Sequence, residues 1–348
     1  MPMSKVRIGI VGTGGIARNR HIPSFQANPD VDLVAASDPV AASLAEVGNQ
    51  FGIAGLYSDY EEMFAKEQLD GVVICTPNKF HAPAAISALN KGINVLCEKP
   101  MALDPAEGRA MIAAAKANHK ILTVGFHYRH RTPVKAAKQI IDSGELGHVY
   151  MVRVNALRRR GIPSWGSFVH KHIQGGGAMI DFGVHTLDTA LYLLGNPKPI
   201  EVSATLSQHL GTKPNVNPWG QWNYQEFTVE DQVAAFVRFE NGASMLLECS
   251  WALNVPESKE TISLSGTEAG LDVFPLKVNK AQHGMLTHWV PDWMEKENEE
   301  PGIGQAADFV NAIKNGGTPN VLAEQALQVT DIVDAIYRSA AAGHAIKL

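Results

Sequence analysis

A glycine-rich turn near the N-terminus constrains the fold of this chain more than any other feature of its sequence. The apolar run Val6–Val11 leads directly into Gly12-Thr13-Gly14-Gly15-Ile16-Ala17, which has the spacing Gly-x-Gly-x-x-Ala. Gly12 permits a tight turn, Gly14 lets a pyrophosphate approach the backbone, and the small Ala17 lets a helix pack on the strand. The free N–H groups at the start of that helix favour negative charge. The sequence therefore predicts a dinucleotide site at Gly12, Gly14, Gly15 and Ile16, and the alternative is an ordinary strand-to-helix connection.

An acidic residue follows the second predicted strand and narrows the choice of dinucleotide. The run Val31–Ser37 ends at Asp38, at about the spacing of roughly 20 residues beyond the glycines that the fingerprint requires. A carboxylate there accepts hydrogen bonds from both hydroxyls of the adenosine ribose and repels a 2′-phosphate. Neither Ser37 nor Pro39 is an arginine that would bind such a phosphate. We therefore expect NAD rather than NADP, and we keep helix capping near Val40 as a second, compatible role for Asp38.

The composition excludes several classes of protein. A chain of 348 residues suits two domains, and a formal charge of −5 without a long basic run gives no basis for nucleic-acid binding. The cysteines Cys75, Cys97 and Cys249 lie in apolar runs and form no C-x-x-C pair, which argues against a disulfide framework or a zinc site. The N-terminus lacks the pattern of a signal peptide, and no apolar stretch approaches the roughly 20 residues that span a bilayer. We expect a cytoplasmic protein with no membrane partner and no metal.

Strand-like and helix-like runs alternate through residues 1–125, which is typical of a doubly wound, mainly parallel α/β sheet. The predicted strands are Val6–Val11, Val31–Ser37, Gly71–Cys75, Asn94–Cys97 and Ile121–Gly125, with a weaker one near Leu56. The predicted helices are Pro39–Phe51, Tyr60–Gln68, His81–Lys91 and Asp104–His119. Ligands of such sheets bind beyond the carboxyl ends of the strands. The polar segments found there are Thr76-Pro77-Asn78 with His81, Glu98-Lys99-Pro100, and Gly125-Phe126-His127-Tyr128-Arg129.

The pattern changes in residues 126–348 and predicts an α+β domain with a largely antiparallel, open sheet. Asn241-Gly242 between two apolar runs is a strong hairpin signal. The predicted strands are Val149–Val154, Ile200–Leu206, Val229–Phe239, Ala243–Trp251 and Thr261–Ser265, and the predicted helices are Pro133–Ser143, Gly304–Lys314 and Ala323–Ala342. The last helices close this domain or pack back on the first. We expect helices to cover one face of the sheet and a second subunit to cover the other, which would make a homodimer or homotetramer.

One helix of the second domain carries a polar constellation. Three glycines, Gly175–Gly177, precede Asp181 and His185, and Gly195 is a plausible end of the helix. An apolar stripe at helical spacing is formed by Ile180, Val184, Leu187, Leu191 and Leu194. Residues four apart share a helix face, so Asp181 and His185 can act on one substrate. The alternative is that Asp181 stabilises the helix start while His185 is a half-buried structural residue.

Taken together, these motifs resemble the glucose–fructose oxidoreductase / inositol dehydrogenase family, Gfo/Idh/MocA. The shared features are the glycine turn, Thr76-Pro77-Asn78 with His81, Glu98-Lys99-Pro100, and the three glycines followed by Asp181 and His185. They occur in order over most of the chain. The resemblance implies an N-terminal Rossmann domain, a C-terminal domain on a large open sheet, and NAD(P)-dependent oxidation or reduction of a CH–OH group in a carbohydrate or cyclitol.

The resemblance also implies a catalytic set, Lys99, Asp181 and His185. Oxidising an alcohol requires a base near the hydroxyl proton, and histidine suits neutral pH, so we assign His185 as that base. Asp181 would orient His185 or bind a neighbouring hydroxyl, and Lys99 would stabilise the negative charge that develops on the oxygen. Whether the lysine or the histidine moves the proton stays open.

Further contacts follow from the resemblance and from residue type. The implied cofactor contacts are Thr76, Pro77, Asn78, Glu98 and Lys99, with His81 assisting. His127 stands where many relatives carry asparagine, so a contact with the nicotinamide and a packing role are both open. Candidate substrate contacts are Arg158 and Trp165, beside Asp181 and His185, because an indole face suits a sugar ring and arginine binds anionic groups. The alternative for Arg158-Arg159-Arg160 is a solvated charge run.

Two other functions compete with a dehydrogenase. A glycosidase-like relative would retain NAD and return the hydride within one cycle. A non-catalytic dinucleotide-binding regulator would be expected to lack the lysine or the histidine, and this chain has both.

Overall fold

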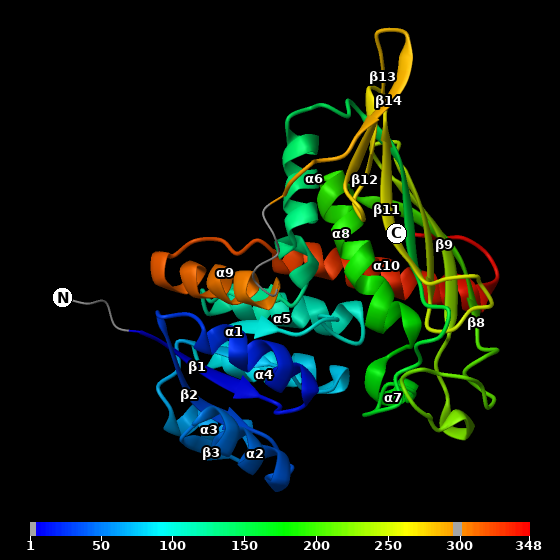
Figure 1. The fold of residues 1–348 in the computed structure, drawn as a ribbon. Helices are drawn as coiled ribbons and strands as arrows, with labels where there is room; N and C mark the ends of the chain where they lie inside the picture. Colours follow the sequence, from blue (N-terminus) through cyan, green and yellow to red (C-terminus); the bar gives the residue numbers. More distant parts are fainter. Residues whose placement is uncertain (1–4, 295–300) are drawn as a thin grey trace. The chain divides into compact units, whose positions relative to one another are not determined.

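The computed structural model describes residues 5–294 and 301–348 (Figure 1). These residues form two compact units. Of the described residues, 5–130 and 301–330 belong to unit 1, and 131–294 and 331–348 belong to unit 2. The long helix α10 (Ala323–Ala342) is divided between the two units.

Unit 1 is built on a six-stranded, wholly parallel sheet. Its strands are β1 (Val6–Val11), β2 (Val31–Ser37), β3 (Gly55–Tyr57), β4 (Gly71–Ile74), β5 (Asn94–Cys97) and β6 (Leu122–Val124). Their order across the sheet is β3-β2-β1-β4-β5-β6, so the direction of winding reverses between β1 and β4. Ligands of doubly wound sheets bind at this reversal, beyond the carboxyl ends of the strands.

Helices cover both faces of the sheet in unit 1. They are α1 (Ile22–Gln26), preceded by a π-type turn η1 (Ala17–His21), α2 (Ala41–Phe51), α3 (Tyr60–Lys66), α4 (His81–Asn90), preceded by η2 (Asn78–Phe80), α5 (Pro105–Ala117), η3 (His127–His130) and α9 (Pro301–Asn315). Strand β4 is buried along its whole length because side chains from both layers of helices cover it.

The segment from α9 onward completes the core of unit 1. Phe309 meets Phe25 edge to face with ring centroids 6.4 Å apart, and both side chains are fully buried. Farther along the chain, the Thr123 hydroxyl donates to the Val321 carbonyl at 2.9 Å. The sheet of unit 1 therefore makes contacts with residues that lie almost 200 positions later in the chain.

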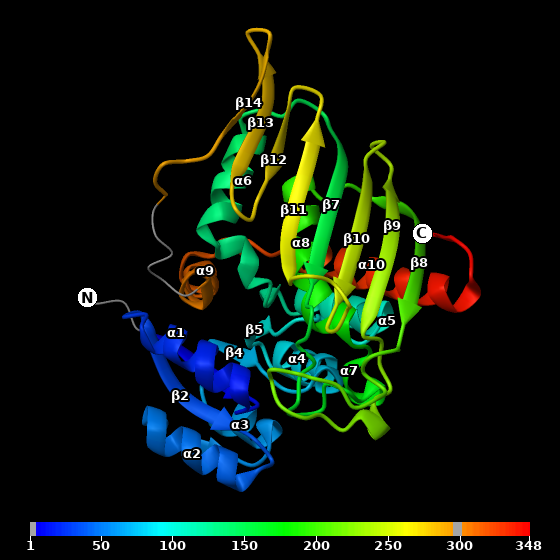
Figure 2. The same cartoon turned by 45° about the vertical axis from the view of Figure 1, so that its right-hand side comes forward.

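Unit 2 is built on a nine-stranded sheet, most of which is visible in Figure 2. Its strands are β7 (Val149–Leu157), β8 (Pro199–Ser207), β9 (Gln232–Phe239), β10 (Ser244–Ser250), β11 (Lys259–Gly266), β12 (Ala269–Asp272), β13 (Lys277–Gln282), β14 (Met285–Trp289) and β15 (Ile346–Lys347). The order is β14-β13-β12-β11-β7-β10-β9-β8-β15. All neighbouring pairs are antiparallel except β7 and β10, which run parallel.

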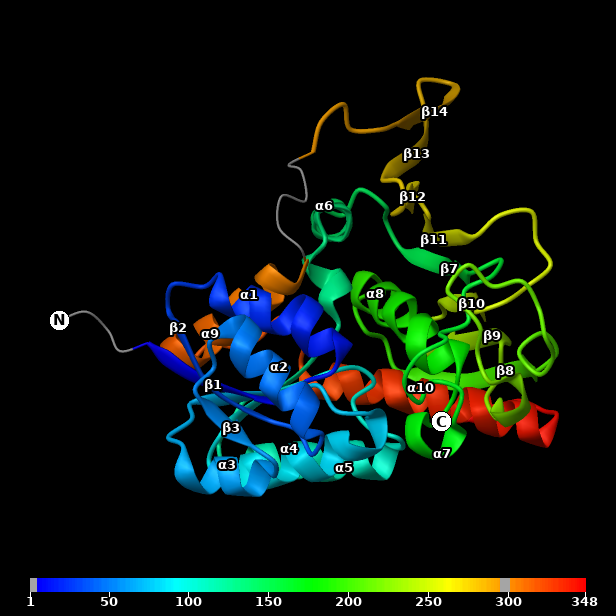
Figure 3. The same cartoon turned by 60° about the horizontal axis from the view of Figure 1, so that its bottom comes forward.

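One face of this sheet is covered by helices (Figure 3). They are α6 (Thr132–Asp142), the π-type turn η4 (Met179–Gly183) continuing into α8 (Val184–Leu194), and the C-terminal part of α10, while α7 (Lys171–Gln174) and η5 (Tyr224–Glu226) lie in connecting loops. Among the described residues, no helix covers the other face. There Leu246 is exposed between Arg153 of β7 and Phe236 of β9. That face therefore mixes apolar and charged side chains.

The predicted fold class is confirmed in both units. Strands β1, β2 and β5 have the predicted bounds, and the Asn241-Gly242 turn joins β9 to β10 with Gly242 at φ +84°. Strands β12 to β15 and the helix α7 were not predicted, because their segments are short and lack the apolar pattern that marks the other elements in the sequence. No helix among the described residues is long and apolar enough to cross a membrane.

Candidate active site

The glycine turn of unit 1 has the backbone geometry that the sequence predicts. Gly12 adopts φ +88°, and a side chain there would come within 2.8 Å of the Cys75 backbone, so only glycine fits. Gly14 differs, since a methyl group added to it would meet no atom of residues 5–294 and 301–348 within 4 Å. The backbone at Gly14 therefore faces open space, at the start of the helical segment that continues into η1 and α1.

Asp38 lies at the end of β2 and is fixed by the glycine turn. Its Oδ2 accepts from the Thr13 N–H at 2.7 Å and from the Thr13 hydroxyl at 3.0 Å, and its Oδ1 accepts from the Val40 N–H at 2.8 Å. The N-cap of α2 is Val40, so Asp38 supports the turn before that helix rather than capping it. Each carboxylate oxygen can accept further bonds, and Asp38 is partly exposed, so hydroxyl groups can still reach it.

The end of β4 provides an independent test of whether a dinucleotide fits. The Oγ1 atom of Thr76 is buried and has no hydrogen-bond partner among the residues that the structure describes. A buried, unsatisfied hydroxyl usually has a ligand or a water as its partner. The open backbone at Gly14, the carboxylate of Asp38 and the unsatisfied Thr76 follow neighbouring strands of one sheet, so their chemistry fits pyrophosphate, ribose and polar nicotinamide-end groups.

The end of β5 holds Lys99 next to a buried ion pair. Glu98 Oε1 lies 2.6 Å from Nε2 of His21, and Glu98 Oε2 accepts from the Lys99 N–H at 3.0 Å. Burial raises the pKa of Glu98, but the hydrogen bond and charge of His21 and the charges of Lys99 and Arg20 outweigh it and lower the pKa to about 2. The carboxylate thus stays ionised and fixes the backbone at Lys99, which is half-buried.

His81 braces the same loop from the neighbouring strand end. Its side chain is 1% exposed, with Nδ1 at 2.7 Å from the Pro100 carbonyl and Nε2 at 2.9 Å from the Thr76 carbonyl. Burial lowers the pKa of His81, against the opposing effect of the two carbonyls. Because both ring nitrogens are engaged by backbone, His81 is better suited to hold the Thr76 and Pro100 loops together than to touch a ligand.

His127 lies buried beside the cations of the same region. Its Nδ1 lies 3.3 Å from Arg20 Nη1, and its ring packs edge to face on Tyr128. Burial and the charge of Arg20 lower the pKa of His127 to about 3, with Lys99 acting in the same direction and Glu98 against it. At neutral pH the ring is therefore uncharged.

In unit 2, a buried carboxylate organises the start of the helix that carries Asp181 and His185. Glu230 accepts from the Gly177 N–H at 2.9 Å, from the Met179 N–H at 3.0 Å and from the Tyr337 hydroxyl at 2.9 Å. A side chain at Gly177 would collide with the Glu230 carbonyl, which explains that glycine. Burial raises the pKa of Glu230, although the three donors act against it.

Asp181 is held by Trp251 and Arg158, which the sequence did not connect to it. Its Oδ2 accepts from Trp251 Nε1 at 2.9 Å and from Arg158 Nη1 at 3.2 Å. The Arg158 guanidinium also lies 4.3 Å from the ring centre of Phe182. Asp181 keeps 17% of its side chain exposed, whereas Trp251 is fully buried. The carboxylate therefore has a fixed orientation and still reaches solvent.

The other arginines of the run have different partners. Arg159 donates to the Pro256 carbonyl, and Arg160 donates to the Leu253 carbonyl and to the Asn254 side chain. These bonds tie the end of β7 to the loop after β10. His185, one turn beyond Asp181 on the same helix, is 8% exposed.

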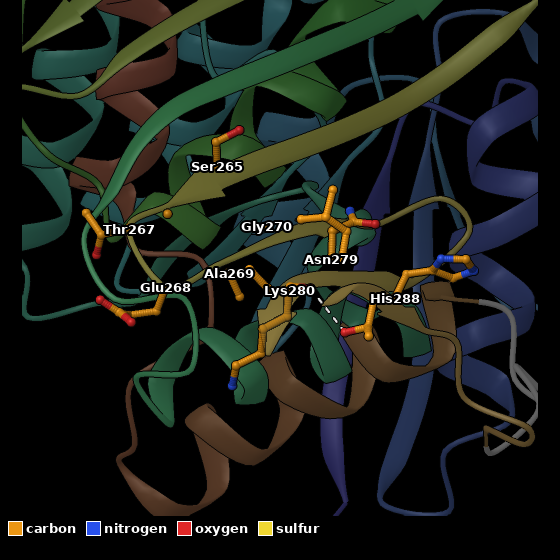
Figure 4. A pocket seen from close by; sticks show the side chains of 12 residues that line it. Ser265, Thr267, Glu268, Ala269, Gly270, Asn279, Lys280 and His288 are labelled. Carbon is orange, nitrogen blue, oxygen red and sulfur yellow. Dashed lines mark hydrogen bonds between the residues drawn. The ribbon is translucent and has the colours of Figure 1, made fainter. Parts of the chain in front are cut away.

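A separate shallow pocket of about 530 Å³ lies on β11 to β14 (Figure 4). Glu268, Lys280 and His288 are among its lining side chains. It contains none of the residues that the sequence singled out, and none of the clusters described above contributes to it.

Comparison with known proteins agrees with this geometry. Residues 6–126 match the family model described as oxidoreductase family, NAD-binding Rossmann fold, and residues 134–272 match the GFO/IDH/MocA C-terminal domain. The chain is also 33% identical to the D-glucoside 3-dehydrogenase of Escherichia coli (strain K12), over 100% of this chain and 99% of the relative. The chain belongs to the Gfo/Idh/MocA family. The resemblance inferred from the motifs is thereby confirmed, as are the NAD-binding fold and the assignment to the oxidoreductases.

Two more relatives show the breadth of the family around this Gfo/Idh/MocA oxidoreductase. D-xylose 1-dehydrogenase (NADP(+)) 2 of Haloferax volcanii is 28% identical over 98% of this chain and 99% of its own. A structure of levoglucosan dehydrogenase in complex with NADH superposes with a TM-score of 0.86 at 26% identity, covering 99% of each chain.

The structure divides the predicted site residues of this Gfo/Idh/MocA oxidoreductase into two groups. In unit 1, the glycine turn contacts Asp38, and His81 joins the Thr76 loop to the loop that carries Lys99. In unit 2, Arg158 contacts Asp181, and His185 lies one turn farther along the helix. Sequence reasoning missed His21 and Glu230, and it did not connect the aromatic candidate Trp251 to Asp181. The acidic pair Glu230-Asp231, placed directly before an apolar strand, was the one visible signal for Glu230.

The buried, neutral His127 predicts a loss of stability in mild acid. Its pKa falls from 6.5 to about 3 on folding, so below pH 6.5 the unfolded chain binds the extra proton and unfolding becomes easier. We expect this residue alone to lower the free energy of unfolding by about 1–2 kcal/mol between pH 6.5 and about pH 5. Glu98 acts in the same direction at lower pH, because its carboxylate is protonated more readily when unfolded.

Urea unfolding at several pH values tests this expectation. In the variant His127→Asn, the free energy of unfolding should depend less steeply on pH than in the wild type. The variant His148→Asn, at an exposed position of unit 2, should keep the pH dependence of the wild type. Equal slopes for all three proteins would contradict the buried, neutral state of His127.

Proposed function

We propose that this protein is an NAD-dependent dehydrogenase that oxidises a secondary hydroxyl of a sugar, glycoside or inositol, or reduces the corresponding ketone. The observation that carries the proposal is the fixed, solvent-accessible carboxylate of Asp181 one helical turn from His185, in a chain whose other unit bears the NAD-binding fold and Lys99. Two relatives, a D-glucoside 3-dehydrogenase and a levoglucosan dehydrogenase, support carbohydrate as the substrate class.

The chemistry assigns one task to each residue. Bound NAD would accept the hydride from the substrate carbon, or return it in reduction. His185 takes the hydroxyl proton as general base, and Lys99 stabilises the negative charge on the oxygen during that transfer. Asp181 binds a neighbouring hydroxyl or orients His185. Arg158 and Trp251 hold Asp181, so its orientation does not depend on the substrate.

A substrate panel tests the proposal. Pyranoses, methyl glycosides, uronates and inositols are each incubated with the protein and NAD, and NADH formation is followed by absorbance. We expect at least one class to be oxidised. No NADH with any class, together with release of a chromogenic aglycone without added NAD, would favour the glycosidase-like alternative. Tight NAD binding without either reaction would favour a regulator.

We also propose that the protein is a cytoplasmic homodimer or homotetramer, with the uncovered face of the unit 2 sheet at the subunit interface. The exposed Leu246 and the partly exposed Phe236 on that face support the interface, and the three buried, free cysteines suit a reducing compartment. Light scattering at micromolar concentration should give a multiple of the 37.6 kDa chain mass, and the mass of one chain would contradict the interface.

A further inference from the structure

Two exposed tryptophans lie side by side in unit 2. Trp165 is 55% exposed and Trp219 is 40% exposed, with ring centroids 5.7 Å apart. Single exposed apolar side chains are common on protein surfaces, whereas adjacent indoles from two separate loops form the kind of patch that marks a binding site. We propose that this Trp165/Trp219 platform binds the aglycone of the substrate, which is therefore a glycoside whose second group presents a flat ring. The proposal rests on the proposed function and makes it more specific.

The two loops that carry the platform are fixed to each other. The Asn217 side chain accepts from the Ile162 N–H at 3.2 Å and donates to the Ile162 carbonyl at 2.8 Å and to the Gly220 carbonyl at 2.9 Å. The Ser164 hydroxyl donates to the Trp219 carbonyl. The hydrogen bonds thus fix the backbone of the loops that carry the two exposed indoles. A preorganised surface of this kind binds a ligand with little loss of side-chain freedom.

The platform is linked to Asp181 through Arg158. The Arg158 guanidinium lies 4.6 Å from the ring centre of Trp219 while its Nη1 donates to Asp181 Oδ2 at 3.2 Å. A side chain at Gly161 would meet both Arg158 and Trp219, so this glycine permits their close approach. The platform is therefore separated from the candidate catalytic carboxylate by a single side chain. A substrate whose reacting ring contacts Asp181 would place its next group in the neighbourhood of the two indoles.

The charges of the region favour a ring over an anionic group. Arg158 is paired with Asp181, and Arg159 and Arg160 donate to backbone carbonyls of the loop at 253–256. What the platform offers is the flat face of an indole, which stacks on the C–H face of a sugar or on an aromatic ring. A second sugar and an aromatic aglycone share this chemistry, and the experiment distinguishes them.

The test compares three glycosides of the sugar that the substrate panel identifies: the methyl glycoside, the phenyl glycoside and a disaccharide. We expect kcat/KM of the wild type to be about tenfold higher for a ring-bearing glycoside than for the methyl glycoside. Trp165→Ala should lower that ratio about tenfold, and Trp165→Phe should retain most of it because a ring remains. A gain for the phenyl glycoside alone identifies an aromatic aglycone, and a gain for the disaccharide identifies a second sugar.

The matched control is Trp289→Ala. Trp289 is also 40% exposed but lies on β14, several strands away from β7 and β10 in the sheet. Its removal should therefore change neither kcat/KM nor the ratio of kcat/KM between the glycosides. A wild-type ratio near one, or equal effects of Trp165→Ala and Trp289→Ala, would overturn the platform while leaving the dehydrogenase function intact. Oxidation of free sugars or inositols but of no glycoside would also overturn the platform and leave the proposed function intact. If no compound of the substrate panel is oxidised, the proposed function fails, and calorimetric binding of phenyl glucoside still tests the platform. The platform is supported if Trp165→Ala weakens this binding and Trp289→Ala does not. It is overturned if the wild type does not bind phenyl glucoside or if both variants bind it equally well.

Discussion

Replacing Lys99 with alanine is expected to lower kcat by about 10²–10³ while the affinity for NAD stays within a few-fold of the wild type. Lys99 is the second residue after β5, and its backbone is fixed by the ionised Glu98. A preorganised positive charge costs no rearrangement when charge develops on the substrate oxygen, so its removal should appear in kcat rather than in cofactor binding. Stopped assays of NADH formation and fluorescence titration with NAD measure the two quantities.

The variant His185→Ala should have an effect of similar size, and the double variant shows whether the two residues act together. Residues that act in one step give strongly non-additive effects. We therefore expect the double variant to be little slower than the slower single variant. Effects that multiply would indicate independent roles.

Controls for these variants come from residues of the same type. Lys66, whose side chain is 62% exposed on α3, and the exposed His148 should tolerate alanine without a change in kcat. Turnover near that of the wild type in Lys99→Ala or His185→Ala, with NAD binding retained, would remove that residue from the catalytic set.

The second large effect is expected at Glu230. Replacing it with alanine leaves the N–H groups of Gly177 and Met179 and the hydroxyl of Tyr337 without their acceptor in a buried site. Each unsatisfied buried donor costs about 1–3 kcal/mol, so we expect a loss of about 3–5 kcal/mol in the free energy of unfolding. Since the N–H groups of Gly177 and Met179 lie at the start of the helix that carries Asp181, kcat should fall as well. Urea unfolding and steady-state assays measure both effects.

Conservative variants separate the hydrogen bonds from the charge. Glu230→Gln keeps a carbonyl oxygen and removes a carboxylate whose ionised form burial already disfavours, so it should cost less than Glu230→Ala. Tyr337→Phe removes one of the three donors and should cost about 1 kcal/mol. Glu226→Ala, at an exposed position of the same loop region, is the matched control. Wild-type stability in Glu230→Ala would contradict the organising role of Glu230.

Local patterns predicted unit 1 well because its strands are buried on both faces. Such strands appear as short apolar runs between helices, and β1, β2 and β5 have the predicted bounds. The strands β13 and β14 lack that signal. Leu286 is 94% exposed and its neighbours in β14 are largely exposed as well, so hydrophobicity does not alternate along the strand. Backbone pairing with β12 holds this part of the sheet, and a pairing partner is not visible in a local pattern.

In the candidate site, too, the local features could be predicted from the sequence and the long-range contacts could not. The helix with Asp181 and His185 was predicted because its apolar stripe and Gly195 are local, and Gly195 does end α8 at φ +84°. The partners of Asp181 could not be predicted, since Arg158 and Trp251 stand 23 and 70 positions away from it. The π-type turns η1 and η4, at the start of the two helices that the motifs identified, also left no trace in the residue pattern. Such turns are rare and often occur at functional sites.

The packing of α9 on β1 and α1 has a consequence for the order in which the protein is made. The first strands of unit 1 leave the ribosome early, but Phe309 and Val321, which complete their core, are synthesised roughly 200 residues after β6. At about 5–20 residues per second this interval lasts roughly 10–40 s. During that time the apolar surface around Phe25 has no native cover. The first unit to begin folding can be completed only after nearly all of unit 2 has been translated, so nascent chains of this protein are expected to need protection by chaperones at their N-terminal half.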